Sequence, residues 1–134
     1  MVASLTRGEL NRNPGNVRRV QGVTWQGESP YQTDSAFVQF SDVAYGIRAI
    51  VRIMRSYKRQ GLNTIGEAID RWAPPNENNS AAYVSAVCRD CGIGADDVVD
   101  FDTIMPQLVK AIINHENGEC VYTNDQILDG IKLA

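Results

Sequence analysis

Residues 41–61 read SDVAYGIRAIVRIMRSYKRQG, and this stretch decides the fold class. Its apolar residues recur every three or four positions, which places them along one face of a helix. They are Val43, Ile47, Ile50, Val51, Met54 and Tyr57. Ser41 is a helix-capping residue, Asp42 suits the positive end of the helix dipole, and Gly61 ends the pattern. The sequence therefore predicts a long amphipathic helix with one buried face.

The rest of the chain shows four more helix signals. Thr64 with Glu67, and Thr123 with Gln126, have the spacing of capping boxes, in which two side chains satisfy the first backbone groups of a helix. Glycine and proline residues supply the ends. The expected helices are a short one after Thr64 that Pro74 and Pro75 stop, Ser80–Cys91 closed by Gly92, one that Asp102 caps and Gly118 ends, and a short one after Thr123.

Residues 1–35 are rich in Gly, Asn, Pro and Arg, and we expect a short helical turn followed by an ordered loop. Ala36–Phe40 alternates apolar and polar residues, which predicts a short strand paired with the stretch around Thr24–Trp25. No repeat, low-complexity tract or linker interrupts the chain. The expected fold class is mainly α, one compact helical domain over residues 1–134 with a small β element.

The composition, with 43% hydrophobic and 22% charged residues, is that of an ordinary globular domain. No apolar run approaches the roughly 18 residues needed to span a bilayer, so no membrane insertion is expected. The first residues, MVASLTRGEL, lack the apolar core of a secretion signal. We therefore expect the protein to be made in the cytoplasm and to need another route for any work outside it.

The net charge of −3 is unevenly distributed. Residues 1–61 carry nine Lys and Arg against four Asp and Glu, a charge of +5, whereas residues 62–134 carry four against twelve, a charge of −8. The basic half is either a solvated helix face or a surface that attracts a polyanion. No nucleic-acid-binding motif accompanies it, so no nucleic-acid partner is expected, whereas a negatively charged cell wall fits the charge.

Three cysteines raise the question of metal or redox chemistry. Cys88 and Cys91 have CxxC spacing, and Cys120 stands apart. The pair falls at the end of an expected helix, whereas a redox pair with a low thiol pKa favours a helix start. A zinc site needs more ligands than one histidine adds to it. We expect free, partly buried thiols, no metal and no organic cofactor.

Glu116 stands out by its position in IINHENG, residues 112–118. It follows the apolar stripe of an expected helix and precedes a glycine, so it can border a cleft on a rigid backbone. Partial burial favours the protonated form of a carboxylate, which general acid catalysis requires. The alternative is an exposed glutamate near a helix end. His115 points about 100° away from Glu116 on a helix, and we expect a surface or core role for it.

Two further segments combine aromatic residues with amides. The first is NPGNVR at residues 13–18, followed by Trp25, and the second is RWAPPNENN at residues 71–79, followed by Tyr83. Amides donate and accept hydrogen bonds at once, as sugar hydroxyls require, and aromatic faces can stack on sugar rings. The alternatives are an ordinary loop held by Asx-turns for the first segment and a core role of Trp72 for the second.

Together, the segments NPGNVRR, WQG, FVQFSDVAYGIRAIVRIMRSY and TIGEAIDRWAPPNENNSAAYVSAVC resemble small phage-encoded virion or lysis proteins. They also resemble the later part of lysozyme-like glucosaminidases. In those enzymes, and in the soluble lytic transglycosylases, a helix ending in Glu-Ser-Gly comes first and supplies the catalytic acid. Too little chain precedes Asn13 to hold that helix, but LVKAIINHENG at residues 108–118 is similar to it, with Asn117 in place of Ser. The resemblance implies a lysozyme-like domain whose catalytic helix has moved to the C-terminus by circular permutation.

The activity that this resemblance implies is cleavage of the β-1,4 bond between N-acetylmuramic acid and N-acetylglucosamine, with Glu116 as general acid and then base. The implied groove residues are Asn13, Asn16, Trp25, Gln39, Trp72 and Tyr83. A second carboxylate would favour hydrolysis over lytic transglycosylation, and the candidates for it are Glu28, Asp34 and Glu119. Glu9 is the acid of an unpermuted alternative, but no apolar helix leads into it. Permutation requires that Glu116 face the turn at residues 13–16 across a cleft.

The implied partner is the glycan strand of peptidoglycan, and no metal or cofactor is needed. A protein made in the host cytoplasm without a signal peptide would reach the wall by holin-type release or as a virion component, beside other virion proteins. The rival hypothesis is a non-catalytic phage structural or cell-wall-binding protein that uses the same groove. Asn117 in place of Ser and the lack of a firm second carboxylate favour that rival.

Overall fold

The computed structural model describes residues 4–134, and within them the chain is mainly α-helical, as predicted. The start of the N-terminal stretch, residues 1–3, lies outside the described part. The helices are α1 (Arg7–Leu10), α2 (Val43–Arg59), α3 (Ile65–Trp72), α4 (Ser80–Cys91), α5 (Met105–Asn117) and α6 (Asn124–Leu133), with a 3₁₀ turn, η1 (Phe101–Ile104), before α5.

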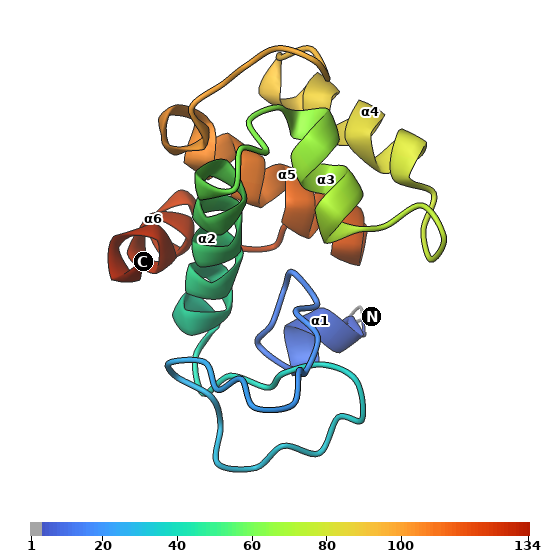
Figure 1. Ribbon diagram of the computed structural model, residues 1–134. Helices are drawn as coiled ribbons and strands as arrows, with labels where there is room; N and C mark the ends of the chain where they lie inside the picture. The colour runs from blue at the N-terminus through green and yellow to red at the C-terminus, as the bar shows by residue number, and fades with distance from the viewer. Residues whose placement is uncertain (1–3) are drawn as a thin grey trace.

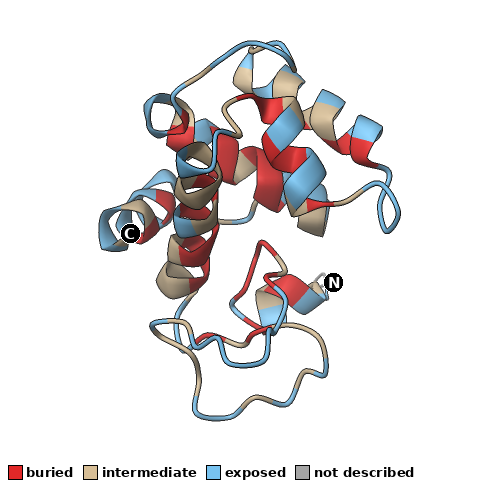
Figure 2. Cartoon of the chain, viewed as in Figure 1, coloured by how far each residue is buried: buried red, intermediate tan, exposed pale blue. Residues whose placement is uncertain are grey.

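The helices from α2 to α6 form the upper part of the molecule in Figure 1, and α1 with the loop up to residue 42 lies beneath them. The main core lies between α2, α3 and α5, where the ribbon is buried in Figure 2. Helix α6 packs directly on α2. The approach is close, because a Cβ atom built on Gly130 would lie 2.4 Å from Cγ2 of Ile47. No helix of the described residues is long and apolar enough to span a membrane.

Two helix starts differ from the prediction. Asp42, not Ser41, caps α2, because its carboxylate accepts the backbone N–H of Ala44 at 2.8 Å. Asp100, not Asp102, caps the segment before α5, because a 3₁₀ turn intervenes there. Pro106 then stands in the first turn of α5, where its missing N–H has no helical partner to lose. The predicted Ser80–Cys91 helix and the capping box at Thr123 are confirmed.

The predicted strand pairing is wrong. The structure has two isolated antiparallel bridges in this region, Arg18 with Phe37 and Glu28 with Phe40, and no ladder to Thr24–Trp25 among the described residues. Side chains take over the backbone groups that a ladder would use. The Asp34 carboxylate accepts the N–H groups of Ala36 and Phe37, which holds this stretch as an ordered loop.

A second, smaller apolar cluster fixes this loop to the helices. Its buried members are Val17, Val38, Phe40 and Ala49. Trp25 and Trp72 pack against it from the N-terminal loop and from α3. The loop that carries the first amide-rich segment is therefore held on the same side of the molecule as the end of α3.

Candidate functional site

A groove of about 620 Å³ lies between the N-terminal loop, helices α2 and α3, and the loop that follows α3. Trp25 and Trp72 both line it, as predicted for sugar-stacking residues, and Glu116 at the end of α5 lines it as well. Glu116 also borders a smaller hollow of about 250 Å³, together with Tyr83 and His115. The carboxylate thus lies where two open spaces meet.

Glu116 is held by two hydrogen-bond donors. Asn16 Nδ2 donates to its Oε1 at 3.0 Å, and the Tyr83 hydroxyl donates to its Oε2 at 2.8 Å. The segments that the permutation hypothesis pairs therefore do meet, across 100 positions of the chain. Each carboxylate oxygen can accept about two hydrogen bonds, so one position on each stays open toward a ligand.

Tyr83 is the centre of a short polar chain. Trp72 Nε1 donates to its hydroxyl oxygen at 3.1 Å, and the ring is 2% exposed and stacks on His115 with centroids 3.8 Å apart. Burial, and next the charge of Glu116, raise the pKa of Tyr83 far above its ordinary value. The hydroxyl therefore keeps its proton and serves as a fixed donor to Glu116. His115 is exposed and packs on this ring, in line with the surface role expected of it.

Asn16 presents its amide from a strained turn. Its φ of 50° lies in the left-handed region, which asparagine tolerates better than most residues. Beneath it, Asn13 was expected to line the groove, but it is wholly buried. Its amide donates to the carbonyls of Val17 and Val38 at 2.9 and 2.8 Å, so it builds the turn and is not available to a ligand.

Gln39 was also expected to line the groove, and it does not. Its side-chain oxygen accepts the backbone N–H groups of Thr33 and Asp34, and its own backbone N–H donates to the side-chain oxygen of Gln32. These contacts fold the loop at residues 32–39 and leave Gln39 outside the residues that line the groove. In both corrections, an amide that could serve a sugar instead satisfies the backbone of an irregular loop.

Asn117, the last residue of α5, ties the end of that helix to the N-terminal segment. Its Oδ1 accepts from the Thr6 hydroxyl at 2.6 Å, and its Nδ2 donates to the carbonyl of Pro14 at 2.7 Å. The fit is tight, because a Cβ atom built on Gly8 would lie 2.7 Å from Asn117 Oδ1. Asn117 thus holds the turn that carries Asn16.

The candidates for a second carboxylate have other partners. Glu28 accepts the backbone N–H of Trp25, and Asp34 forms a salt bridge with Arg7 at 2.6 Å. Glu119 is exposed and does not line the groove. The alternative acid, Glu9, accepts the backbone N–H of Thr6 in the capping box of α1. Glu77 is the acidic residue that lines the groove together with Glu116. It lies in the segment 71–79, where only the aromatic residues and amides were predicted to line a groove.

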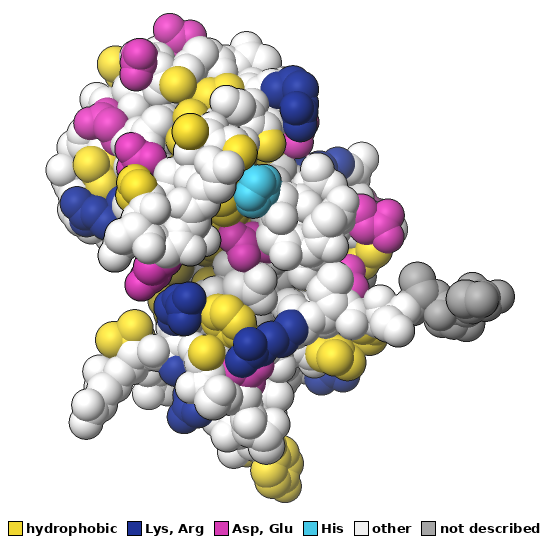
Figure 3. Space-filling model, turned by 90° about the vertical axis from the view of Figure 1, so that its right-hand side faces the viewer, with side chains coloured by type: hydrophobic (Ala, Val, Ile, Leu, Met, Phe, Trp, Pro, Cys, Tyr) yellow, Lys and Arg dark blue, Asp and Glu magenta, His cyan; other side chains and the backbone are white. Residues whose placement is uncertain are grey.

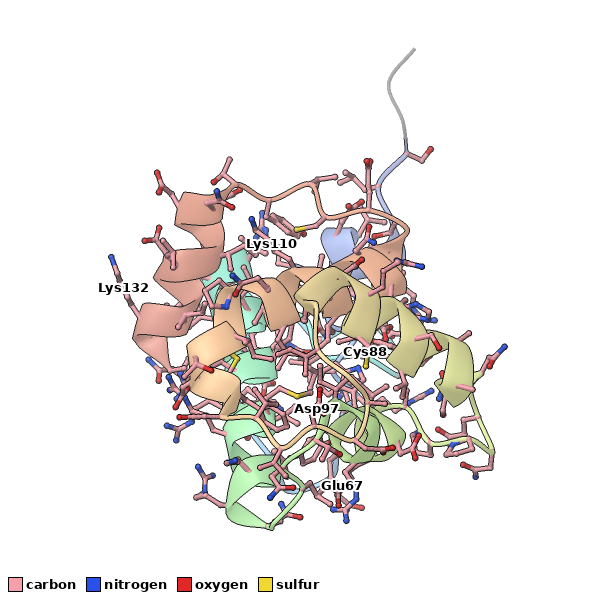
Figure 4. The ribbon with its side chains drawn as sticks, turned by 90° about the horizontal axis from the view of Figure 1, so that it is seen from above. Glu67, Cys88, Asp97, Lys110 and Lys132 are labelled. Carbon is pink, nitrogen blue, oxygen red and sulfur yellow. The ribbon has the colours of Figure 1, made fainter. Side chains whose placement is uncertain are left out.

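The cysteines are free and partly buried, as expected. Burial first, and then the charges of Asp97 and Asp96, raise the pKa of Cys88, which lies on α4 close to the following loop (Figure 4). Burial also raises the pKa of Cys91 to about 11. These thiols stay protonated at neutral pH. Among residues 4–134, no group of three or more His, Cys, Asp or Glu side chains could hold a metal ion.

Charge is distributed unevenly over the face in Figure 3, with Lys and Arg gathered on the lower, N-terminal part and most Asp and Glu above. Two arginines, Arg18 and Arg71, line the groove itself. The sequence placed the basic excess in residues 1–61 without indicating that part of it borders the same cleft as Glu116. That placement depends on how α3 packs against the N-terminal loop.

Comparison with known proteins gives a bacteriophage relationship. No family model matches the chain. The chain is 36% identical over 134 residues to protein P5 of Pseudoalteromonas phage PM2, in a match that covers 98% of this chain and 83% of that protein. The chain therefore belongs to the same family as this phage protein. This relationship confirms the predicted connection to bacteriophages.

Proposed function

We propose that the protein cleaves the glycan strands of peptidoglycan at the β-1,4 bond between N-acetylmuramic acid and N-acetylglucosamine. The observation that carries the proposal is the carboxylate of Glu116, which Asn16 and Tyr83 hold at the edge of a groove. Trp25 and Trp72 line the same groove and offer flat apolar surfaces to sugar rings. The two spaces beside Glu116 suit a polymer that continues past the bond to be broken.

In this mechanism Glu116 first protonates the oxygen that leaves, and the resulting carboxylate then acts as a base. Asn16 and Tyr83 donate hydrogen bonds that stabilise the carboxylate after it has given up its proton. The base activates either water, which gives hydrolysis, or the 6-hydroxyl of the muramic acid itself, which gives an anhydro ring. The single firmly held acid favours the second route, lytic transglycosylation.

Glu77 is the residue that would shift this choice toward hydrolysis. It lines the groove on the loop after α3, and a second carboxylate near the reacting carbon is the usual partner of the acid in glycoside hydrolysis. Analysis of the products separates the routes, because only transglycosylation leaves anhydro-muramic ends. Substitution of Glu77 by Gln lowers the rate strongly if the protein is a hydrolase and weakly if it is a transglycosylase.

A lysozyme-like origin with circular permutation also belongs to this proposal. Its support is the meeting of the end of α5 with the turn at residues 13–16, through both Glu116 and Asn117. A protein of this kind, made in the host cytoplasm, would act on the wall after holin-type release or as a virion component in contact with other virion proteins.

The decisive experiment compares wall clearing by the purified wild type and by Glu116→Gln. We expect the variant to lose at least about 100-fold in rate, since general acid catalysis contributes on this order. Glu119→Gln is the matched control, because Glu119 is exposed, lies three positions away and does not line the groove. A wild type that leaves peptidoglycan intact, or a Glu116→Gln variant as active as the control, contradicts the proposal.

The second candidate function is non-catalytic binding to the cell wall. The observation that favours it is the occupation of both Glu116 oxygens by protein donors, a contact pattern that also suits a purely structural carboxylate. A protein of this kind would sediment with isolated cell walls and release no soluble fragments from them. The same pair of variants distinguishes this outcome, because Glu116→Gln would then sediment as the wild type does.

A further inference from the structure

Arg18 and Arg71 line the groove of Glu116 from two different elements, the first from the loop after the Asn16 turn and the second from α3. Both are exposed. The salt bridges found among residues 4–134 involve other arginines, so neither of these two has an acidic partner there. Neither guanidinium is therefore held in an ion pair by a carboxylate of the described residues.

Uncharged groups hold both guanidinium groups in place. The Arg18 guanidinium lies over the ring of Phe37, 5.3 Å from its centroid. Arg71 Nη1 donates to the side-chain oxygen of Gln60 at 3.0 Å, and the Arg71 charge lies near the hydroxyl of Tyr57, another residue of the groove. A guanidinium has five N–H donors in a flat fork, so most donors of both side chains stay open to a ligand.

The ligand that suits these donors is a carboxylate, which a guanidinium can bind through two parallel hydrogen bonds. Glu116 is engaged by Asn16 and Tyr83, and Glu77 is the other acidic residue along the groove. The lining thus combines aromatic surfaces, two acidic residues and two arginines that form no salt bridge with either of them. Of the two sugars in peptidoglycan, N-acetylmuramic acid carries carboxylates and N-acetylglucosamine carries none.

We propose that Arg18 and Arg71 bind the carboxylates carried by the muramic acid residues of the glycan strand and so select peptidoglycan over neutral glycans. This inference rests on the proposed function for its substrate. The carboxylate has two sources, the lactyl group when it bears no peptide and the acidic residues of the peptide stem when one is attached. Both sources offer the same chemistry to a guanidinium.

The test measures binding in the Glu116→Gln background, so that the ligand survives. Three ligands are compared, namely oligomers of N-acetylglucosamine, muramic-acid-containing strands freed of peptide, and strands that keep their peptides. We expect the strands with carboxylates to bind more tightly than the neutral oligomers. Added salt should weaken their binding, because it screens the attraction between the charges. Tighter binding by peptide-free strands alone identifies the lactyl group as the source, and tighter binding by peptide-bearing strands alone identifies the stem.

Adding Arg18→Gln or Arg71→Gln to that background should weaken binding of the carboxylate-bearing strands about tenfold each and leave the neutral oligomers unaffected. Arg52→Gln is the matched control, because Arg52 is an exposed arginine of α2 that does not line the groove. Equal binding of all three ligands, or arginine variants that bind as the control does, overturns the inference. Cleavage by the wild type is measured separately, so selective binding without cleavage rejects the proposed activity and retains the role of the arginines.

Discussion

The side chains of Thr6 and Asn117 share a hydrogen bond of 2.6 Å although 111 positions separate them in the chain. The same Asn117 amide donates to Pro14 at 2.7 Å, two residues before Asn16. The end of α5 is therefore joined twice to the N-terminal segment beside Glu116. A serine at position 117 has a shorter side chain with a single donor, and it could not reach both partners from the same place on the helix.

Asn117→Ala should lower both stability and activity. The substitution leaves Thr6 and Pro14 without their partners in a partly buried contact, which costs about 1–3 kcal/mol in the free energy of unfolding. Urea denaturation measures this loss, and kcat should fall further than KM rises because the turn that holds Asn16 loosens. Asn114→Ala is the control, since Asn114 is exposed in the same last turn of α5 and changes helix propensity equally. Equal stabilities of the two variants would contradict the role of Asn117.

Asn16 can be tested with a pair of substitutions that separate its backbone from its side chain. Asn16→Gly and Asn16→Ala both remove the donor to Glu116, so both should reduce wall clearing. Only alanine suffers from the positive φ of 50°, and we expect it to be less stable than the glycine variant by about 1 kcal/mol. Thermal or urea unfolding measures the difference. A glycine variant with full activity would show that the Asn16 amide does not assist Glu116.

Tyr83→Phe should leave the fold intact and weaken the support of Glu116. The lost hydroxyl leaves Trp72 Nε1 and Glu116 Oε2 without a partner, at a cost of about 1–3 kcal/mol. Because the pKa of Tyr83 is strongly raised, Tyr83 should not ionise up to pH 11 in the native protein. An absorbance titration to that pH should therefore count as many ionising tyrosines in Tyr83→Phe as in the wild type. Loss of an ionising group in Tyr83→Phe would contradict the buried donor.

The helices were predictable because their signals are local. The apolar period of α2, the capping box at Thr123 and the glycine after α4 act within a few residues of the element they define. The loop at residues 28–40 was not predictable in the same way. Its backbone groups are satisfied by the side chains of Asp34 and Gln39, and alternation alone cannot distinguish that arrangement from a strand.

The residues of the site also differ in how far the local sequence could predict them. Glu116 was a candidate from its place at a helix end and gained weight from a resemblance. Asn16, Trp25 and Trp72 were candidates from their chemistry, and all four residues line the groove. Asn13 was misplaced because a buried turn uses the same amide chemistry as a sugar. Arg18, Arg71 and Glu77 were missed because membership of the groove depends on tertiary packing. Arg71 and Glu77 lie in the segment RWAPPNENN, and its charged side chains are the one sequence signal that pointed to them.

The ion pair and hydrogen bonds of Asp34 should make the free energy of unfolding fall at acid pH. The Arg7 guanidinium first, then the N–H of Ala36, the Asn11 amide and the N–H of Phe37, hold the pKa of Asp34 well below its ordinary value. The unfolded chain therefore binds the proton first as the pH falls, so this stabilisation is present above about pH 4 and is lost progressively below it. Urea unfolding of the wild type and Asp34→Asn should differ at pH 7 and converge toward pH 2. Asp129→Asn, which removes an exposed carboxylate of α6, is the charge-matched control.

Gly27 and Gly22 provide a matched test of the loop that carries Trp25. Both have a φ of 81°, so alanine at either position costs about 1 kcal/mol for the backbone alone. At Gly22 nothing lies within 4 Å of the added Cβ, whereas at Gly27 the atom would lie 2.0 Å from Cγ of Tyr45. Gly27→Ala should therefore destabilise the protein clearly more than Gly22→Ala in urea unfolding. Equal effects would show that the loop can move off the Tyr45 ring.

The bond between Asn16 and Glu116 also sets when the site can exist. Ribosomes add roughly 5–20 residues per second, so the turn with Asn16 is made roughly 5–20 s before the acid that it holds. Once residue 72 has been added, the nascent chain has the loop and both tryptophans of the groove but not Glu116. Under the proposed function, a chain that ends just before residue 116 would keep both tryptophans of the groove and lack the proposed acid.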